Sequence, residues 1–199
     1  MTSMRASTDG SMLLISGASG AGKSTICERL LRDPRVVFSV SATTRKRRPG
    51  EVDGRDYIFL SPDEFKERVG RGEFIEHANV HGNMYGTLRA PMEEALAEGK
   101  IYLVEIDVQG ALQLKSMNIS GIYVFIAAPD PEALRARLEG RGTETVEDLE
   151  RRLAKAADEN REQHHYDHVV VNDVLEDAVE EVRRIAGLDP CRSEQKESS

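Results

Sequence analysis

The sequence has few cysteines, no excess of positive charge and no long apolar run. Its two cysteines, Cys27 and Cys191, lie far apart in 199 residues, so a disulfide framework is not expected and a reducing compartment fits. No apolar stretch reaches the ~18–20 residues that a membrane-spanning helix needs, and residues 1–11 are too polar for a signal peptide. The sequence therefore predicts a cytoplasmic protein without a membrane partner.

The charge balance also argues against a nucleic-acid partner. The chain carries 27 Lys and Arg against 35 Asp and Glu, a formal net charge of −8, whereas proteins that grip duplex nucleic acid are usually basic along the contact. The dense basic run at residues 45–48 could serve a local anion site, a solvated loop or a localisation signal. A length of 199 residues and 39% hydrophobic composition are typical of one compact domain.

Apolar strands and amphipathic helices alternate along most of the chain. Five apolar runs predict strands buried on both faces of a parallel sheet, at residues 12–16, 36–40, 101–106, 122–127 and 168–171. Helical patterns separate most of them, at residues 23–31, 91–98, 132–139 and 174–186. This alternation predicts an α/β three-layer sandwich with right-handed crossovers.

Two segments interrupt the alternation. Residues 43–88 carry short strand patterns and a capping box from Ser61 to Glu64, which predicts a small, mostly β insertion with one helix. Residues 139–153 are charged and glycine-hinged, which fits either a mobile flap over a site or an ordinary solvent-facing helix turn. The expected main domain is residues 12–187, between loose segments at 1–11 and 188–199.

The strongest motif is a glycine-rich loop between the first expected strand and the helix that follows it. Residues 17–24 read GASGAGKS, the G-x-x-x-x-G-K-S pattern of a phosphate-binding P-loop. Its backbone N–H groups and the helix N-terminus favour a bound phosphate. The motif predicts that Lys23 reaches the β- and γ-phosphates of ATP and that Ser24 ligates Mg²⁺. The candidate ATP-binding residues here are Gly17, Ala18, Ser19, Gly20, Ala21, Gly22, Lys23, Ser24 and Thr25.

Several further motifs follow the P-loop along the chain. They are residues 39–57, SVSATTRKRRPGEVDGRDY, and residues 73–76, 82–87 and 137–144. In this order the first three resemble the GMP-binding region of guanylate kinases and the last resembles the lid of that family, so the resemblance covers residues 12–187. The resemblance implies a P-loop core at residues 12–42 and 89–187, a GMP-binding insertion at about 43–88 and a helical lid at about 138–155.

The resemblance also implies an acceptor site in the insertion. The residues implied to hold the GMP phosphate are Arg45, Arg48, Tyr57 and Tyr85, and guanidinium forks match phosphate oxygens well. The further GMP-binding candidates are Ser41, Glu76, Gly86 and Thr87, of which Ser41, Glu76 and Thr87 align with guanine-reading groups. For Glu76 the alternative is an exposed strand glutamate in an ordinary ion pair. Lys46 and Arg47 match no family contact and are expected in a solvated loop.

Two carboxylates follow the expected strand at residues 101–106. Glu105 and Asp107 alternate, so they share one face and point toward the crevice at the carboxyl ends of the strands. Asp107 is the candidate Mg²⁺ ligand beside Ser24, and both carboxylates are candidate GMP-binding residues. The family usually has aspartate at both positions, so the contact of Glu105, with the acceptor nucleotide or with Mg²⁺-bound water, stays open. A milder departure is Ala18, where many members have proline.

Three arginines match the lid residues that the resemblance assigns to the phosphates of ATP and the transferring group. Arg137, Arg141 and Arg152 are, with Lys23, the candidate catalytic residues, because fixed cations stabilise charge on the equatorial oxygens of the transition state. The alternative is surface ion pairing with neighbouring acidic residues. Asn172 aligns with a residue near the adenine.

The predicted function is in-line transfer of the γ-phosphoryl group of ATP to GMP, with Mg²⁺, without a covalent intermediate. One alternative is a non-enzymatic guanylate-kinase-like interaction module, which the intact P-loop disfavours. Another is a kinase for a different nucleoside monophosphate, which Glu76 disfavours. The cluster His164, His165 and His168 is expected at the surface, because few other metal-ligating residues accompany it. The oligomeric state does not follow from the sequence.

Overall fold

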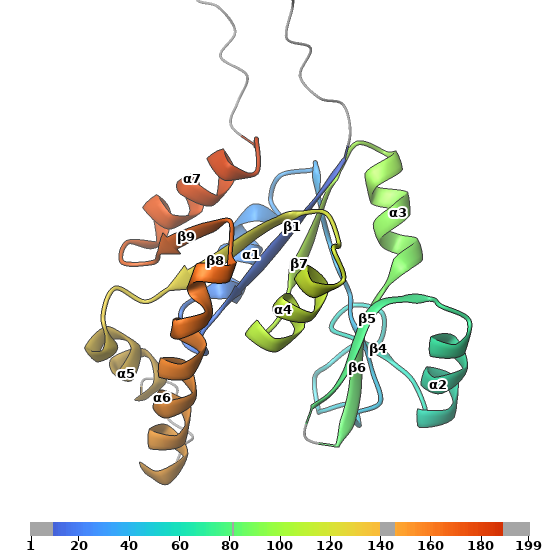
Figure 1. Cartoon of the computed structure of the whole chain (residues 1–199), viewed down its shortest axis with the longest axis horizontal. Coiled ribbons are helices and arrows are strands. Elements are labelled where there is room, and N and C mark those ends of the chain that lie inside the picture. The colour runs from blue at the N-terminus through green and yellow to red at the C-terminus, as the bar shows by residue number, and fades with distance from the viewer. Residues whose placement is uncertain (1–9, 81, 140–145, 189–199) are drawn as a thin grey trace, which may run out of the picture.

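The computed structural model describes residues 10–80, 82–139 and 146–188, and a parallel five-stranded sheet forms its centre. The strand order is β2-β7-β1-β8-β9, with β1 in the middle (Figure 1). The strands are β1 (Ser11–Gly17), β2 (Val36–Phe38), β7 (Ile101–Glu105), β8 (Ile122–Ala127) and β9 (His168–Val171). The change of direction in strand order on either side of β1 opens a crevice at the carboxyl ends of the strands.

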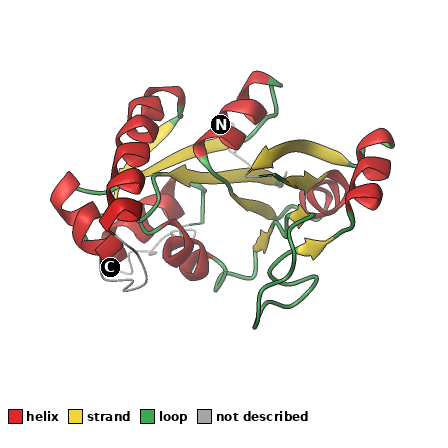
Figure 2. Cartoon of the chain, turned by 90° about the horizontal axis from the view of Figure 1, so that it is seen from below, coloured by secondary structure: helices red, strands yellow, loops and turns green. Residues whose placement is uncertain are grey.

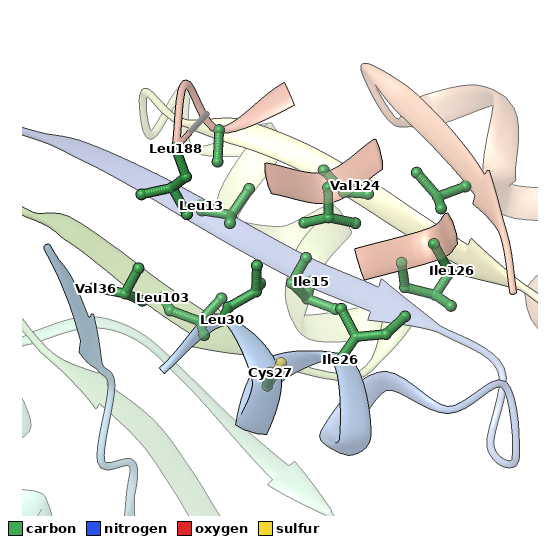
Figure 3. Close-up of a cluster of buried hydrophobic side chains, with 14 of the residues drawn as sticks. Leu13, Ile15, Ile26, Cys27, Leu30, Val36, Leu103, Val124, Ile126 and Leu188 are labelled. Atoms are coloured by element: carbon green, nitrogen blue, oxygen red, sulfur yellow. The ribbon is translucent and has the colours of Figure 1, made fainter. Parts of the chain in front are cut away.

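Helices cover both faces of this sheet, because successive residues of the buried strands point to opposite sides. Leu13 and Ile15 pack with α1 (Lys23–Leu30) and α7 (Leu175–Ile185), in the cluster that Figure 3 draws. Met12 and Leu14 pack on the other face. The helices on that side are α3 (Arg89–Ala97) and α4 (Val108–Ser116). The predicted three-layer α/β sandwich is confirmed (Figure 2).

Two features of the main domain differ from the sequence prediction. The run at residues 168–171 was expected to be buried on both faces, but β9 is an edge strand in which Val170 is buried while Val169 and Val171 are exposed. Helix α4 was not predicted, because its nine residues include Gly110 and carry a short apolar pattern. It begins at Asp107, whose Oδ1 accepts a 2.9 Å hydrogen bond from the backbone N–H of Gly110.

A second, four-stranded sheet with the order β4-β3-β6-β5 forms between β2 and α3. Its strands are β3 (Ala42–Thr43), β4 (Ile58–Phe59), β5 (Phe74–Val80) and β6 (Asn83–Leu88). Helix α2 (Pro62–Gly70) begins at the predicted capping box of Ser61 and Glu64. The ring of Phe65 stacks on that of Phe74 at 4.4 Å between centroids and joins α2 to the sheet.

A pair of helices follows β8 and extends from the main sheet in the same direction as the second sheet (Figure 1). They are α5 (Pro131–Glu139) and α6 (Val146–Arg161), followed by the short 3-10 helix η1 (Glu162–His165). Leu134, Leu138 and Ala156 pack against Ala18 of the P-loop and couple both helices to that loop. Within the described part of the chain, no helix has the length and apolar character needed to cross a bilayer.

Candidate functional site

The P-loop connects β1 to α1 and depends on two close backbone approaches. Gly17 and Gly22 have φ values of 137° and 95°, which residues with a side chain rarely adopt. A Cβ atom at Gly17 would lie 2.1 Å from the carbonyl oxygen of Ile126, and one at Gly22 would lie 2.2 Å from Nδ2 of Asn172. These glycines therefore allow the loop to lie directly against β8 and the residue after β9.

Lys23 lies folded over this loop. Its Nζ donates hydrogen bonds to the carbonyl oxygens of Gly17, at 2.7 Å, and Ala18, at 2.9 Å. Burial lowers the pKa of the Lys23 ammonium, while the nearby Glu105 carboxylate acts to raise it. The ammonium lines the P-loop cavity, a hollow of about 200 Å³ formed by Ser19, Gly20, Gly22, Lys23, Ser24, Thr25 and Glu105. A P-loop sequence with one lysine at such a cavity suits a polyphosphate.

Oxygen donors meet at the edge of the P-loop cavity. The Ser24 hydroxyl donates a 2.7 Å hydrogen bond to Oε1 of Glu105, 81 residues away in sequence. Glu105 ends β7, and Asp107, the N-cap of α4, follows two residues later. One hydroxyl and two carboxylates are hard oxygen ligands of the kind that Mg²⁺ prefers, so these residues fit the expected ion.

A larger hollow, the insertion cavity, lies between the second sheet and the carboxyl end of β7. Its volume is about 450 Å³. It is lined by Arg45, Arg48, Glu51, Tyr57, Glu76, Ala78, Tyr85, Glu105, Ile106, Asp107 and Gly110. The structure thus brings seven of the ten GMP-binding candidates to one cavity, whereas Ser41, Gly86 and Thr87 do not line it.

One wall of the insertion cavity is cationic and aromatic. The guanidinium carbon of Arg45 lies 5.3 Å from the centre of the Tyr57 ring, which meets the Tyr85 ring edge-on at 6.0 Å. Both amino groups of Arg45 donate to the carboxylate of Glu51, at 2.7 and 3.1 Å. This wall can present guanidinium and phenol donors together to an oxyanion.

The lining of the insertion cavity also contains a buried carboxylate. Glu76 on β5 is 6% exposed, and its Oε1 accepts a 2.8 Å hydrogen bond from Oγ1 of Thr87, its cross-strand partner on β6. Burial raises the pKa of Glu76, and the hydrogen bonds from Thr87 act against that rise. The expected alternative, an exposed glutamate in an ordinary ion pair, is therefore wrong. Gly86 lets β6 approach β5, since a Cβ there would lie 2.7 Å from the Phe74 ring.

A third hollow, the α6 cleft, separates α6 from the second sheet and has a volume of about 810 Å³. It is lined by Ser19, Asn79, Asp107, Gln109, Arg151, Arg152 and Lys155. Arg152 Nη2 donates a 2.7 Å hydrogen bond to the Ser19 hydroxyl of the P-loop. The three hollows meet, because Glu105 lines the first two, Ser19 lines the P-loop cavity and the α6 cleft, and Asp107 lines the insertion cavity and the α6 cleft.

The remaining candidates lie beside the P-loop or outside the described residues. Arg137 Nη2 donates a 2.8 Å hydrogen bond to the carbonyl oxygen of Asn172, whose Nδ2 donates to the carbonyl of Ala21. The other amino group of Arg137 is buried without a hydrogen-bond partner among the described residues. Arg141 lies outside the described residues.

Sequence reasoning missed several residues that line these hollows. Glu51 lies within the insertion motif at residues 39–57, but no function was predicted for it. The Pro49-Gly50 pair before it is a turn signal that could have indicated its position. No motif in the sequence pointed to four residues that line the α6 cleft, which are Asn79, Gln109, Arg151 and Lys155. Lys46 and Arg47 are exposed, as expected. No group of three or more His, Cys, Asp or Glu suited to a metal occurs in residues 10–80, 82–139 and 146–188.

Comparison with known proteins identifies the family. A family model described as guanylate kinase matches residues 9–187. A guanylate kinase of Clostridium perfringens is 47% identical over 184 residues, covering 92% of this chain and 85% of that protein. One from Geobacter metallireducens is 45% identical over 186 residues, covering 93% and 92%. The crystal structure of guanylate kinase from Anaplasma phagocytophilum matches with a TM-score of 0.72 at 34% identity, covering 94% of this chain and 89% of that one. The chain therefore belongs to the guanylate kinase family.

Proposed function

We propose that this protein transfers the γ-phosphoryl group of ATP to GMP and releases ADP and GDP. The observation that carries this proposal is that the P-loop cavity and the insertion cavity share the wall residue Glu105. One hollow suits a polyphosphate, and the other combines an anion-binding wall with a buried carboxylate. In this proposal the P-loop core, the insertion at about 43–88 and the lid at about 138–155 supply the donor site, the acceptor site and its cover.

The donor nucleotide is proposed to occupy the P-loop cavity. Inward backbone N–H groups of the loop hold the β-phosphate, and Lys23 leaves the carbonyl oxygens of Gly17 and Ala18 to pair with phosphate oxygens. Arg137 is proposed to contact the phosphates of ATP, and Asn172, whose carbonyl oxygen accepts a hydrogen bond from Arg137 beside the loop, is proposed to border the adenine. The unpartnered amino group of Arg137 supports a ligand there.

The acceptor nucleotide is proposed to occupy the insertion cavity. Arg45 and Arg48 pair with its phosphate, and the hydroxyls of Tyr57 and Tyr85 add donors. Glu76 faces the base, because guanine offers N1–H and a 2-amino group that a carboxylate can accept, whereas adenine offers an acceptor at N1. Thr87 supports this assignment through its hydrogen bond to Glu76, and Ser41 is proposed as a further residue that contacts the guanine.

Magnesium is proposed to bind at the junction of the two cavities. Ser24 and Asp107 are the proposed ligands, and Glu105, hydrogen-bonded to Ser24, is proposed to contact the acceptor nucleotide or an Mg²⁺-bound water. When bound, Mg²⁺ would neutralise charge on the β- and γ-phosphate oxygens.

Transfer requires positioning more than covalent chemistry. Glu105 lines both cavities, so a GMP phosphate oxygen in one cavity can be aligned with the γ-phosphorus of an ATP molecule in the other. Arg152, already hydrogen-bonded to Ser19 of the P-loop, and Arg141 are proposed to neutralise charge on the transferring group. Closure of the α6 cleft would exclude water that could otherwise accept the phosphoryl group.

The decisive experiment is a coupled assay of ADP release with ATP and a panel of GMP, dGMP, AMP and UMP. We expect rapid turnover with GMP and a kcat/KM for AMP lower by about 10⁴, the discrimination typical of a site that hydrogen-bonds one base and leaves the other unpaired. Preference for AMP or UMP would support a different monophosphate kinase. Absence of turnover with every acceptor would support the interaction-module alternative.

A further inference from the structure

Glu51 holds both arginines of the insertion cavity at once. Its Oε1 and Oε2 accept from Nη2 and Nη1 of Arg45, at 2.7 and 3.1 Å, and Oε2 also accepts from the backbone N–H of Arg48 at 2.7 Å. The Arg45 and Glu51 side chains are 14% and 19% exposed. Three charge-assisted hydrogen bonds in a partly dry setting are more directional than an ordinary surface ion pair.

A tight turn brings Glu51 to this position. The backbone N–H of Glu51 donates to the carbonyl oxygen of Arg48 at 3.2 Å, and Gly50 between them has φ of 89°. Proline followed by a residue with positive φ is the pattern of a type II turn. Arg48 and Glu51 therefore close a four-residue loop whose ends are joined by backbone and side-chain hydrogen bonds.

Glu51 engages only one edge of the Arg45 guanidinium, and the Tyr85 hydroxyl also interacts with this guanidinium. A guanidinium offers two edges with paired donors, one formed by Nη1 and Nη2 and the other by Nε and Nη2. Glu51 occupies the first edge, and the carbonyl oxygen of Lys46 accepts from the same Nη1 at 2.8 Å. The second edge is not used by Glu51, and the guanidinium stacks on the Tyr57 ring at 5.3 Å.

We propose that Glu51 is a positioning residue for the acceptor phosphate: it orients Arg45 by its Nη1–Nη2 edge and fixes the turn that carries Arg48, so that both cations face the phosphate. This inference rests on the proposed binding of GMP in the insertion cavity. The Arg45 guanidinium, followed by the Arg48 backbone N–H, lowers the pKa of Glu51, so the carboxylate stays charged at neutral pH.

The opposite role would be competition, in which Glu51 occupies the place of the phosphate and must be displaced. Displacement would break three hydrogen bonds and release the turn at Gly50. The two roles predict opposite effects when the charge of Glu51 is removed. A positioning residue strengthens phosphate binding, whereas a competitor weakens it.

The test is Glu51→Gln, which keeps the shape but points an N–H₂ group at cationic donors. Titration calorimetry with GMP and with guanosine, without ATP, separates phosphate recognition from base recognition. We expect the dissociation constant for GMP to rise about tenfold, that for guanosine to change less than about twofold, and kcat at saturating GMP to stay within about threefold. The matched control is Glu67→Gln, which changes an exposed ion pair with Arg71 in the same insertion.

Three results would overturn the inference. Tighter binding of GMP to Glu51→Gln would show that Glu51 competes with the phosphate. An equal loss of affinity for GMP and guanosine would show that Glu51 supports the structure in general. Unchanged affinity for GMP would show that Glu51 has no role in binding the phosphate. Should Glu51→Gln fail to fold, Gly50→Ala keeps every charge but strains the turn, and the same selective loss of GMP affinity is expected. A wild-type protein that binds GMP without forming GDP would contradict the proposed activity, while the binding comparison would still test Glu51.

Discussion

The hydroxyl of Thr87 holds one oxygen of the Glu76 carboxylate by a 2.8 Å hydrogen bond between neighbouring strands. Because a hydroxyl donates a single hydrogen, it fixes which oxygen of Glu76 points toward β6 and which remains for the insertion cavity. Glu76 is 6% exposed and Thr87 is 1% exposed, so water does not replace this contact. The pair therefore sets the hydrogen-bonding character of one wall of the cavity.

Replacing Glu76 with glutamine should reverse part of the base preference. The amide oxygen can still accept from Thr87, so the N–H₂ group would face the base and meet the donors of guanine. We expect the ratio of kcat/KM for GMP over AMP to fall by about 100-fold or more, since the mismatched donor stays buried and unpaired. Parallel assays of GDP and ADP formation measure this ratio.

A matched substitution separates this effect from loss of charge alone. Glu73 lies just before β5 and pairs with Arg71 at the surface, so Glu73→Gln should keep the full preference for GMP. Full preference in a folded Glu76→Gln protein would show that Glu76 does not read the base.

Lys23→Ala should nearly abolish turnover without unfolding the protein. In the structure the ammonium donates hydrogen bonds to two loop carbonyl oxygens, whereas in the proposed reaction it offsets phosphate charge. We expect kcat to fall by about 10³ or more and the free energy of unfolding to change by less than about 1 kcal/mol. Lys100→Ala, at an exposed ion pair with Glu98, is the control. Turnover near the wild-type level would contradict the assignment of Lys23.

Gly22→Ala should destabilise the protein by more than backbone strain alone. The new Cβ would lie 2.2 Å from Nδ2 of Asn172 at a φ of 95°. We expect a loss of about 2–4 kcal/mol in urea unfolding, combining left-handed strain with displacement of Asn172 from the carbonyl of Ala21. Gly187 also has a positive φ, of 67°, but a Cβ atom there would meet open space. Gly187→Ala should therefore lower the free energy of unfolding by only about 1 kcal/mol. Equal costs would mean that Asn172 moves aside freely.

Asp33 should make the free energy of unfolding depend on pH in the acid range. Its carboxylate accepts from Nε and Nη2 of Arg35 and from Nη2 of Arg183 on α7, and its side chain is 8% exposed. The hydrogen bonds from Arg35 in particular lower the pKa of Asp33 below its ordinary value of 3.8. A lowered folded-state pKa means that the unfolded chain binds the proton first, so this stabilisation is present above pH 3.8 and declines as the pH falls further.

The test compares wild type with Asp33→Asn in urea unfolding from pH 3 to 7. We expect the variant to be less stable by about 2 kcal/mol at pH 7, with the difference shrinking toward pH 3. Asp158→Asn removes a highly exposed ion pair with Arg161 and should cost less than about 0.5 kcal/mol. A difference for Asp33→Asn that did not vary with pH would exclude the proposed linkage.

The features that the sequence by itself determined are those set by neighbouring residues. The P-loop and the capping box of Ser61 and Glu64 both involve groups a few positions apart. Backbone conformation and capping act over such short spans, so residue types alone predict them. The periodicity of apolar residues likewise predicted the alternation of strands and helices.

The tertiary structure alone decided which distant groups meet. Ser24 donates a hydrogen bond to Glu105, 81 positions away in the sequence, and Arg152 donates one to Ser19, 133 positions away. These contacts depend on strand order and on the packing of α6 against the P-loop, and local patterns carry neither. The same reason explains β9: its apolar run predicted a central strand, but only the order of the sheet places it at the edge, where Val169 and Val171 are exposed.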